Sequence, residues 1–177
     1  MESLINKIYE DKEFICIIDD IINNEIVQKM KDFRQHYNVS CFEHCLCVSY
    51  YSYLICKKLK LDYKSVARAG MLHDLFLYDW RKRENGREGL HAFTHPKTAL
   101  ENSLKLFDLN EKEKDIILKH MWPVTIVPPK YLESYIITFV DKHCAISETF
   151  NSIANIWHGK TAFRYAYVFL ALLFIRI

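Results

Sequence analysis

The chain contains few residues that end helices. Only four glycines and four prolines occur among its 177 residues, while half of the residues are hydrophobic and 14% are aromatic. This composition is typical of a packed globular protein. Because many short strands would need many turn residues, the scarcity of glycine and proline predicts long helices. We therefore expect an all-α fold, a bundle of about six to eight helices, in a single domain that spans residues 1–177.

Hydrophobic periodicity and capping residues predict the helix boundaries. Asp62 is expected to cap one helix, Pro96 to lie in the first turn of another, and Asn110 with Glu113 to form a capping box. The segment 79–94 does not fit a helix and is expected to be a lid or a binding loop. The expected helices cover residues 2–33 (one helix or a pair), 41–59, 63–77, 94–107, 110–122, 131–150 and 161–175.

Charge and cysteine content narrow the class of protein. The formal net charge of +2 is too weak to indicate a nucleic-acid partner. Residues 1–13 are polar and of mixed charge, unlike a secretory signal. Six cysteines without zinc-type C-x-x-C spacing are best interpreted as reduced, buried thiols. The sequence therefore predicts a cytoplasmic protein.

The segment 165–175 is strongly apolar and lies between Arg164 and Arg176. Its eleven residues fall short of the roughly 20 that a helix needs to cross a bilayer. We expect no transmembrane segment, and a buried final helix over 161–175. Docking to a membrane or a partner is the alternative.

The pair His73-Asp74 ends an apolar helical run and carries the strongest chemical signal. An imidazole nitrogen and a carboxylate oxygen together suit a borderline or hard divalent ion. The alternative is a buried histidine followed by an aspartate at a helix terminus. The pair alone does not decide between these two interpretations.

Other polar residues are expected to point into the bundle. His44, His120 and Asp141 lie on apolar helix faces, and His95 follows the polar loop. A single inward histidine is more often a hydrogen-bonded core residue than a ligand. An inward carboxylate, however, needs a cation, a partner or a proton. Facing helices of a bundle are where such side chains assemble a metal site.

The order of these residues resembles the signature of the HD superfamily. Phe42-Glu-His44 resembles the family's first motif, which ends in Glu-His. Ala69-Gly-Met-Leu-His-Asp resembles Ala-Ala-Leu-Leu-His-Asp, and Phe139-Val-Asp141-Lys142 resembles the final Ala-Asp-Lys. The match places a motif core at 41–150. The chain lacks the Gly-Tyr-Pro motif of the cyclic-dinucleotide phosphodiesterases, and Met121 stands where that branch often has a second histidine.

The resemblance implies an HD-domain helical bundle and hydrolysis of a phosphoester. It implies one bound divalent metal ion. In relatives with two further histidines it implies a second ion, and Asp74 would then bridge the two. The metal could be manganese, magnesium, iron, nickel or zinc. It also implies catalytic roles for Asp74 and Lys142. The implied metal ligands are His44, His73, Asp74, Asp141, His95 and His120. Candidate phosphate-binding residues are Arg81, Arg83, Arg87 and Lys97.

Three functions follow from this resemblance. The first is a metal-dependent phosphohydrolase that acts on a nucleotide or another small phosphorylated metabolite. The second is a di-iron oxygenase, because some HD proteins use the same six-ligand pattern with iron. The third is a non-catalytic metal-binding or regulatory module. A homo-oligomer is possible in each case, and the sequence does not identify the substrate.

Overall fold

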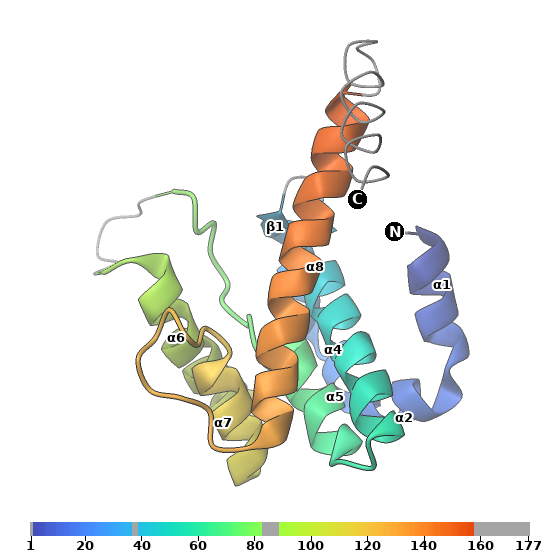
Figure 1. The fold of residues 1–177 in the computed structure, drawn as a ribbon, viewed down its shortest axis with the longest axis vertical. Coiled ribbons are helices and arrows are strands. Elements are labelled where there is room, and N and C mark those ends of the chain that lie inside the picture. The colour runs from blue at the N-terminus through green and yellow to red at the C-terminus, as the bar shows by residue number, and fades with distance from the viewer. Residues whose placement is uncertain (1, 37–38, 83–88, 158–177) are drawn as a thin grey trace, which may run out of the picture.

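The computed structural model describes residues 2–36, 39–82 and 89–157, and it confirms an all-α fold (Figure 1). None of the helices in these ranges is both long enough and apolar enough to cross a membrane. The helices are α1 (Glu2–Glu10), α2 (Lys12–Ile22), α3 (Glu25–Gln28), α4 (Cys41–Lys58), α5 (Tyr63–Leu72), α6 (His91–Leu106), α7 (Glu111–Lys119) and α8 (Leu132–Trp157). A 3-10 turn, η1 (Lys29–Asp32), and two short antiparallel strands, β1 (Arg34–His36) and β2 (Val39–Ser40), precede α4.

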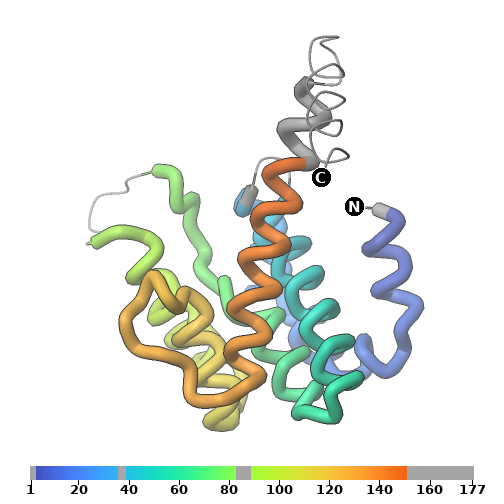
Figure 2. The backbone as a smooth tube through the Cα atoms, viewed as in Figure 1, coloured from blue at the N-terminus to red at the C-terminus, as the bar shows by residue number. Residues whose placement is uncertain are grey.

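The long helices α4 and α8 run side by side through the middle of the molecule, and α5 packs behind them (Figure 1). On one flank α6 and α7 pack together, and α7 also contacts α5 and α8. On the other flank α2 packs on α5, and α1 lies beside α4. Helices from both halves of the sequence therefore surround α4 and α5, as the backbone tube in Figure 2 shows.

Capping residues confirm several predicted boundaries. The Asp62 side chain accepts a hydrogen bond from the Ser65 amide at the start of α5. Asn110 and Glu113 form the predicted capping box of α7. Ser40 and Glu43 form a second capping box at the start of α4. Each box satisfies backbone donors that the first helical turn leaves without partners.

Other boundaries were wrong by several residues. The segment 2–33, predicted as one helix or a pair, is divided into three helices and a 3-10 turn, with Asp11 and Asn24 capping new starts. Helix α5 ends at Leu72 rather than near Leu77, because the chain turns at His73. Helix α6 begins at His91, so Pro96 lies in its second turn. Helix α8 extends to Trp157, and the predicted helix 161–175 lies outside the described residues.

Helices α4 and α5 approach closely at Gly70. A Cβ atom placed on Gly70 would lie 2.7 Å from the Cα atom of Ser49, a distance that forces one backbone to shift. Ser49 also donates a hydrogen bond of 2.6 Å to the carbonyl of Ala67. A small residue at position 70 thus lets the end of α5 lie against α4, and this brings His73 close to His44.

Candidate metal centre

The six residues predicted as metal ligands converge between α4, α5, α6, α7 and α8. His44 lies on α4, His73 and Asp74 at the end of α5, and Asp141 on α8. Two compact groups could each hold a metal ion: His44 with His73 and Asp141, and His73 with Asp74 and His120. Within each group the potential ligand atoms lie within 4.8 Å of one another. His95 joins the second group through contacts with both Asp74 and His120.

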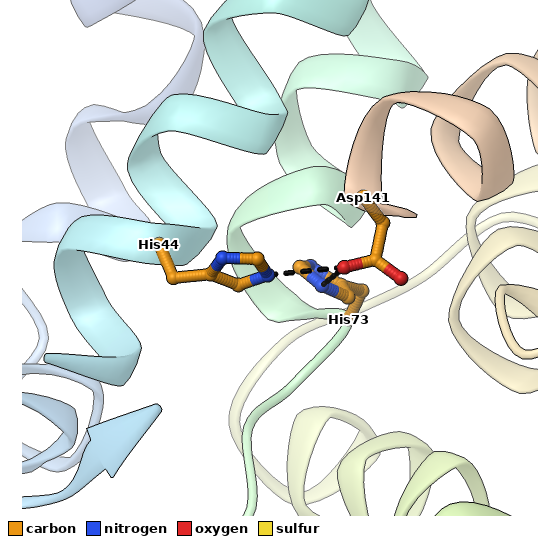
Figure 3. A group of neighbouring side chains, drawn as sticks. All are labelled: His44, His73 and Asp141. Atoms are coloured by element: carbon orange, nitrogen blue, oxygen red, sulfur yellow. Dashed lines mark hydrogen bonds and ion pairs between the residues drawn. The ribbon is translucent and has the colours of Figure 1, made fainter. Parts of the chain in front are cut away.

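In the first group, the imidazoles of His44 and His73 both face one carboxylate oxygen of Asp141 (Figure 3). Oδ1 of Asp141 lies 3.0 Å from Nε2 of His44 and 3.6 Å from Nε2 of His73. Both histidines are fully buried, and only 13% of the Asp141 side chain is exposed. Helix α4, the end of α5 and the distant helix α8 thus present two nitrogens and one oxygen to the same point.

The second group surrounds Asp74. Its Oδ1 atom lies 3.2 Å from Nε2 of His95 and 3.4 Å from Nε2 of His120, while its Oδ2 atom lies 3.5 Å from Nε2 of His73. The two oxygens of one carboxylate therefore face different histidines. Asp74 is buried, and the two groups meet at His73, which belongs to both of them.

The side-chain hydrogen bonds decide which ring nitrogen is available for a cation. Nδ1 of His73 lies 2.8 Å from the Gly70 carbonyl, and Nδ1 of His120 lies 2.8 Å from the Ile117 carbonyl. A carbonyl only accepts, so these Nδ1 atoms carry hydrogens and the Nε2 atoms of the neutral rings carry lone pairs. Each histidine follows the last residue of its helix and satisfies a carbonyl that the helix end leaves without a partner.

Nε2 of His95 and Nε2 of His120 lie only 2.8 Å apart. Nδ1 of His95 also donates to a carbonyl, that of His91, over 2.7 Å. Two neutral rings would then direct lone pairs at each other, which is repulsive unless a proton or a metal ion lies between them. Among the described side chains, His73 Nε2 and Asp74 Oδ1 are buried without a hydrogen-bond partner. These four atoms therefore fit a cation better than an ordinary polar core.

His44 is held differently from the other three histidines. Its Nδ1 atom lies 3.1 Å from each oxygen of Glu148, a buried residue of α8. Burial alone would lower the pKa of His44, but hydrogen bonds to Asp141 and Glu148 raise that pKa well above its ordinary value. A carboxylate commonly lies behind a ligating histidine in metal sites, where it orients the ring and raises its basicity.

Both candidate carboxylate ligands are strongly acidic. Burial alone would raise the pKa of Asp74, but the imidazoles of His73 and His95 hold it well below its usual range. Burial would also raise the pKa of Asp141, but the imidazoles of His44 and His73 lower that pKa. The two groups therefore stay ionised at neutral pH. Negative charge held in a buried site is the electrostatic basis for binding a cation.

The sequence did not point to Glu148 or Gln35. The amide Nε2 of Gln35, on β1, donates to Oδ2 of Asp74 over 2.5 Å. The position of Glu148, seven residues after Asp141, placed both on one face of α8, a signal that could have found it. Nothing in the local sequence distinguishes Gln35, because only the tertiary fold brings β1 to the end of α5.

The remaining predicted residues do not contact the cluster in the same way. Lys142 Nζ donates to the carbonyl of His120 over 3.1 Å. Lys97 follows His95 by two residues, so it points away from the cluster and lies 3.9 Å from Glu101 in solvent. Arg81 pairs with Asp79. Arg83 and Arg87 lie outside the described residues.

Five of the six cysteines are buried as expected, but Cys16 is exposed. Two thiols lie beside the cluster: Cys41 Sγ donates to the Asp74 carbonyl over 3.2 Å, and Cys45 Sγ lies 3.7 Å from Nδ1 of His73. Burial raises the pKa of both thiols. They are therefore interpreted as packing around the cluster rather than as thiolate ligands.

Comparison of the chain with protein-family models, with curated proteins and with solved structures found no match, so the description of this site rests on its own geometry.

Proposed function

We propose that this chain is a metal-dependent phosphohydrolase of the HD type, acting on a small phosphorylated metabolite. The observation that carries the proposal is the convergence of four imidazole Nε2 atoms with the buried carboxylate of Asp74 and the partly buried carboxylate of Asp141. These six side chains occur in the order that resembles the HD signature. The contacts of Asp74 with histidines on both sides support two metal ions rather than one.

The donor set favours some metals over others. Four imidazoles favour iron, nickel or zinc, and the two carboxylates also allow manganese, whereas magnesium prefers oxygen ligands and bound water. When bound, such an ion would lower the pKa of a water molecule and polarise a phosphoryl oxygen. A metal with a preference for nitrogen is therefore expected in the purified protein.

The chain's own residues would hold and orient these parts. His44, His73 and Asp141 would form one end of the site, and His95 and His120 the other, with Asp74 between them. Gln35 donates to Asp74 and fixes the direction of that carboxylate. Lys142, bonded to the His120 carbonyl, would supply a positive charge near the second end.

Two measurements on one preparation test the proposal. Elemental analysis of protein purified without chelator gives the identity and the number of bound metals. Phosphate release from a panel of nucleotides and sugar phosphates, with Mn²⁺ added, tests the activity, and Asp74→Ala is the inactive control. Metal binding with no phosphate release above the Asp74→Ala background would contradict the hydrolase. Two iron atoms with oxygen consumption would support the oxygenase alternative instead.

A further inference from the structure

A β-bulge carries Gln35, the polar side chain that reaches the histidine–aspartate cluster from the small sheet. Arg34 of β1 pairs with Ser40 of β2, and His36 pairs with Val39. The two partners are adjacent on β2 but two positions apart on β1, so Gln35 is the extra residue of the bulge. Bulges are frequent beside functional sites, where they redirect a side chain.

The sheet that carries Gln35 is held in place from several sides. Strand β1 packs against α4 and α8, the helices that carry His44 and Asp141 (Figure 1). The Cys41 amide at the start of α4 donates over 2.8 Å to the carbonyl of Phe33, directly before β1. The capping box at the start of α4 holds the end of β2. The backbone at Gln35 is therefore fixed relative to the cluster.

Only one end of the Gln35 amide group has a partner among the described residues. Its Nε2 atom donates to Oδ2 of Asp74 over 2.5 Å. Its Oε1 atom is buried and accepts no hydrogen bond. His73 Nε2 and Asp74 Oδ1, which belong to the candidate metal centre, are buried in the same condition. The Gln35 carbonyl is thus a third buried polar atom that the cluster leaves without a partner, and it is an acceptor.

This oxygen lies where a water molecule on a bound ion would need an acceptor. The oxygen and nitrogen of one amide group are about 2.2 Å apart, so Oε1 of Gln35 lies within about 5 Å of Oδ2 of Asp74. Two hydrogen bonds of about 2.8 Å that meet at one water molecule span such a gap. A water molecule on a divalent ion gives a lone pair to the metal and has two hydrogens to donate. A buried carbonyl oxygen beside the ion's carboxylate ligand suits one of these hydrogens.

We propose that Gln35 is a positioning residue of this centre, and that its Oε1 atom accepts a hydrogen bond from a water molecule on the ion held by Asp74. This inference rests on the proposed function. One amide group would then hold the carboxylate through Nε2 and the attacking water through Oε1. A nucleophile that is already oriented reacts faster, because less freedom is lost in the transition state. The amide takes up no proton, so it orients the water and does not act as its base.

The alternative is that Gln35 only orients the carboxylate of Asp74. Three substitutions separate the two roles, because they keep different ends of the amide. Gln35→Lys keeps a donor for Asp74 and removes the acceptor, Gln35→Glu keeps an acceptor and removes the donor, and Gln35→Met removes both. Gln28→Met is the matched control, because Gln28 is the only other glutamine of the chain and donates to the Ile22 carbonyl outside the cluster.

Oxygen-17 NMR of the full chain saturated with Mn²⁺ measures how long a water molecule stays on the ion, with no substrate present. Loss of one hydrogen bond predicts water exchange about two- to tenfold faster in Gln35→Met and Gln35→Lys than in the wild type. Gln35→Glu and Gln28→Met should stay close to the wild-type rate. Elemental analysis checks that the variants hold equal amounts of Mn²⁺. In phosphate release, Gln35→Met should lower kcat and leave KM unchanged.

Two patterns of water exchange would overturn the proposal. One is an equal rate in Gln35→Met and the wild type. The other is faster exchange in Gln35→Met and Gln35→Glu but not in Gln35→Lys, which would leave Gln35 only the orientation of Asp74.

The same measurements distinguish this inference from the proposed function. Water exchange that depends on Gln35, without phosphate release, would contradict the hydrolase and support the positioning of water. Phosphate release with water exchange that is independent of Gln35 would do the reverse. A wild type that binds no Mn²⁺ would overturn both.

Discussion

The two ends of the histidine–aspartate cluster hold their histidines through different hydrogen-bond partners. At the first end, two carboxylates of α8 enclose His44: Asp141 faces Nε2 and Glu148 faces Nδ1. At the second end, His95 and His120 are held by carbonyls of their own helices, and Asp74 is the nearest carboxylate. The first end therefore concentrates more negative charge around its ligands. From this difference we expect it to bind a divalent cation more tightly than the second end.

The largest effect is expected at Asp74, which we propose to lie between the two ions. Asp74→Asn keeps the shape of the side chain but removes its charge, and it should reduce Mn²⁺ binding at both ends. We expect a loss in affinity greater than the about 10–100-fold that changes behind a ligand typically cause. Equilibrium dialysis measures this. Asp115→Asn is the control, because Asp115 is a largely buried carboxylate of α7 that pairs with Lys119 outside the cluster.

The next prediction separates the two ends. His120→Gln removes a ligand of the second end only, so the number of bound ions should fall from two to one. The ion that remains should keep nearly wild-type affinity. His44→Gln should remove the tighter ion instead. Titration calorimetry with Mn²⁺ distinguishes the outcomes, and loss of all binding in His120→Gln would show that the cluster acts as one site.

A smaller effect on metal affinity is expected at Glu148, which contacts the proposed ligand His44. Glu148→Gln can still accept a hydrogen bond from His44 but carries no charge, so we expect about tenfold weaker binding at the first end. Glu148→Ala also removes the hydrogen bond, and its loss should approach 100-fold. Glu133→Gln is the matched control, since Glu133 is a buried glutamate of the same helix paired with Lys112. Equal affinity in Glu148→Ala and wild type would contradict the role of Glu148.

The smallest effect on metal binding is expected at Lys142. Its ammonium group bonds the carbonyl of His120 rather than a ligand atom. Lys142→Met should therefore change Mn²⁺ affinity less than Glu148→Gln does. If Lys142 neutralises a phosphate, the rate of phosphate release should fall at an unchanged metal content. A fall in metal content that accounts for the whole loss of rate would rule out that role.

Local signals in the sequence predict much of the fold correctly. The scarcity of glycine and proline indicates helices, and capping residues locate the starts of α5 and α7, because a cap depends on only a few neighbouring residues. The segment 2–33 was predicted as one helix or a pair, so its division into three helices and a 3-10 turn was missed, because helical periodicity continues across short turns. The small sheet was missed as well. Helix α5 ends early because His73 folds back on the Gly70 carbonyl, a contact that periodicity does not show.

By itself, the sequence determined which side chains could hold a cation, because their types and order carry that information. Only the tertiary structure decided that they meet, which ring nitrogens face inward, and that Glu148 and Gln35 support them. The sequence also proposed Lys97 as a phosphate ligand, and the structure places its side chain in solvent, 3.9 Å from Glu101. The physical reason is that helix packing fixes distances between segments far apart in the chain, whereas sequence patterns constrain only near neighbours.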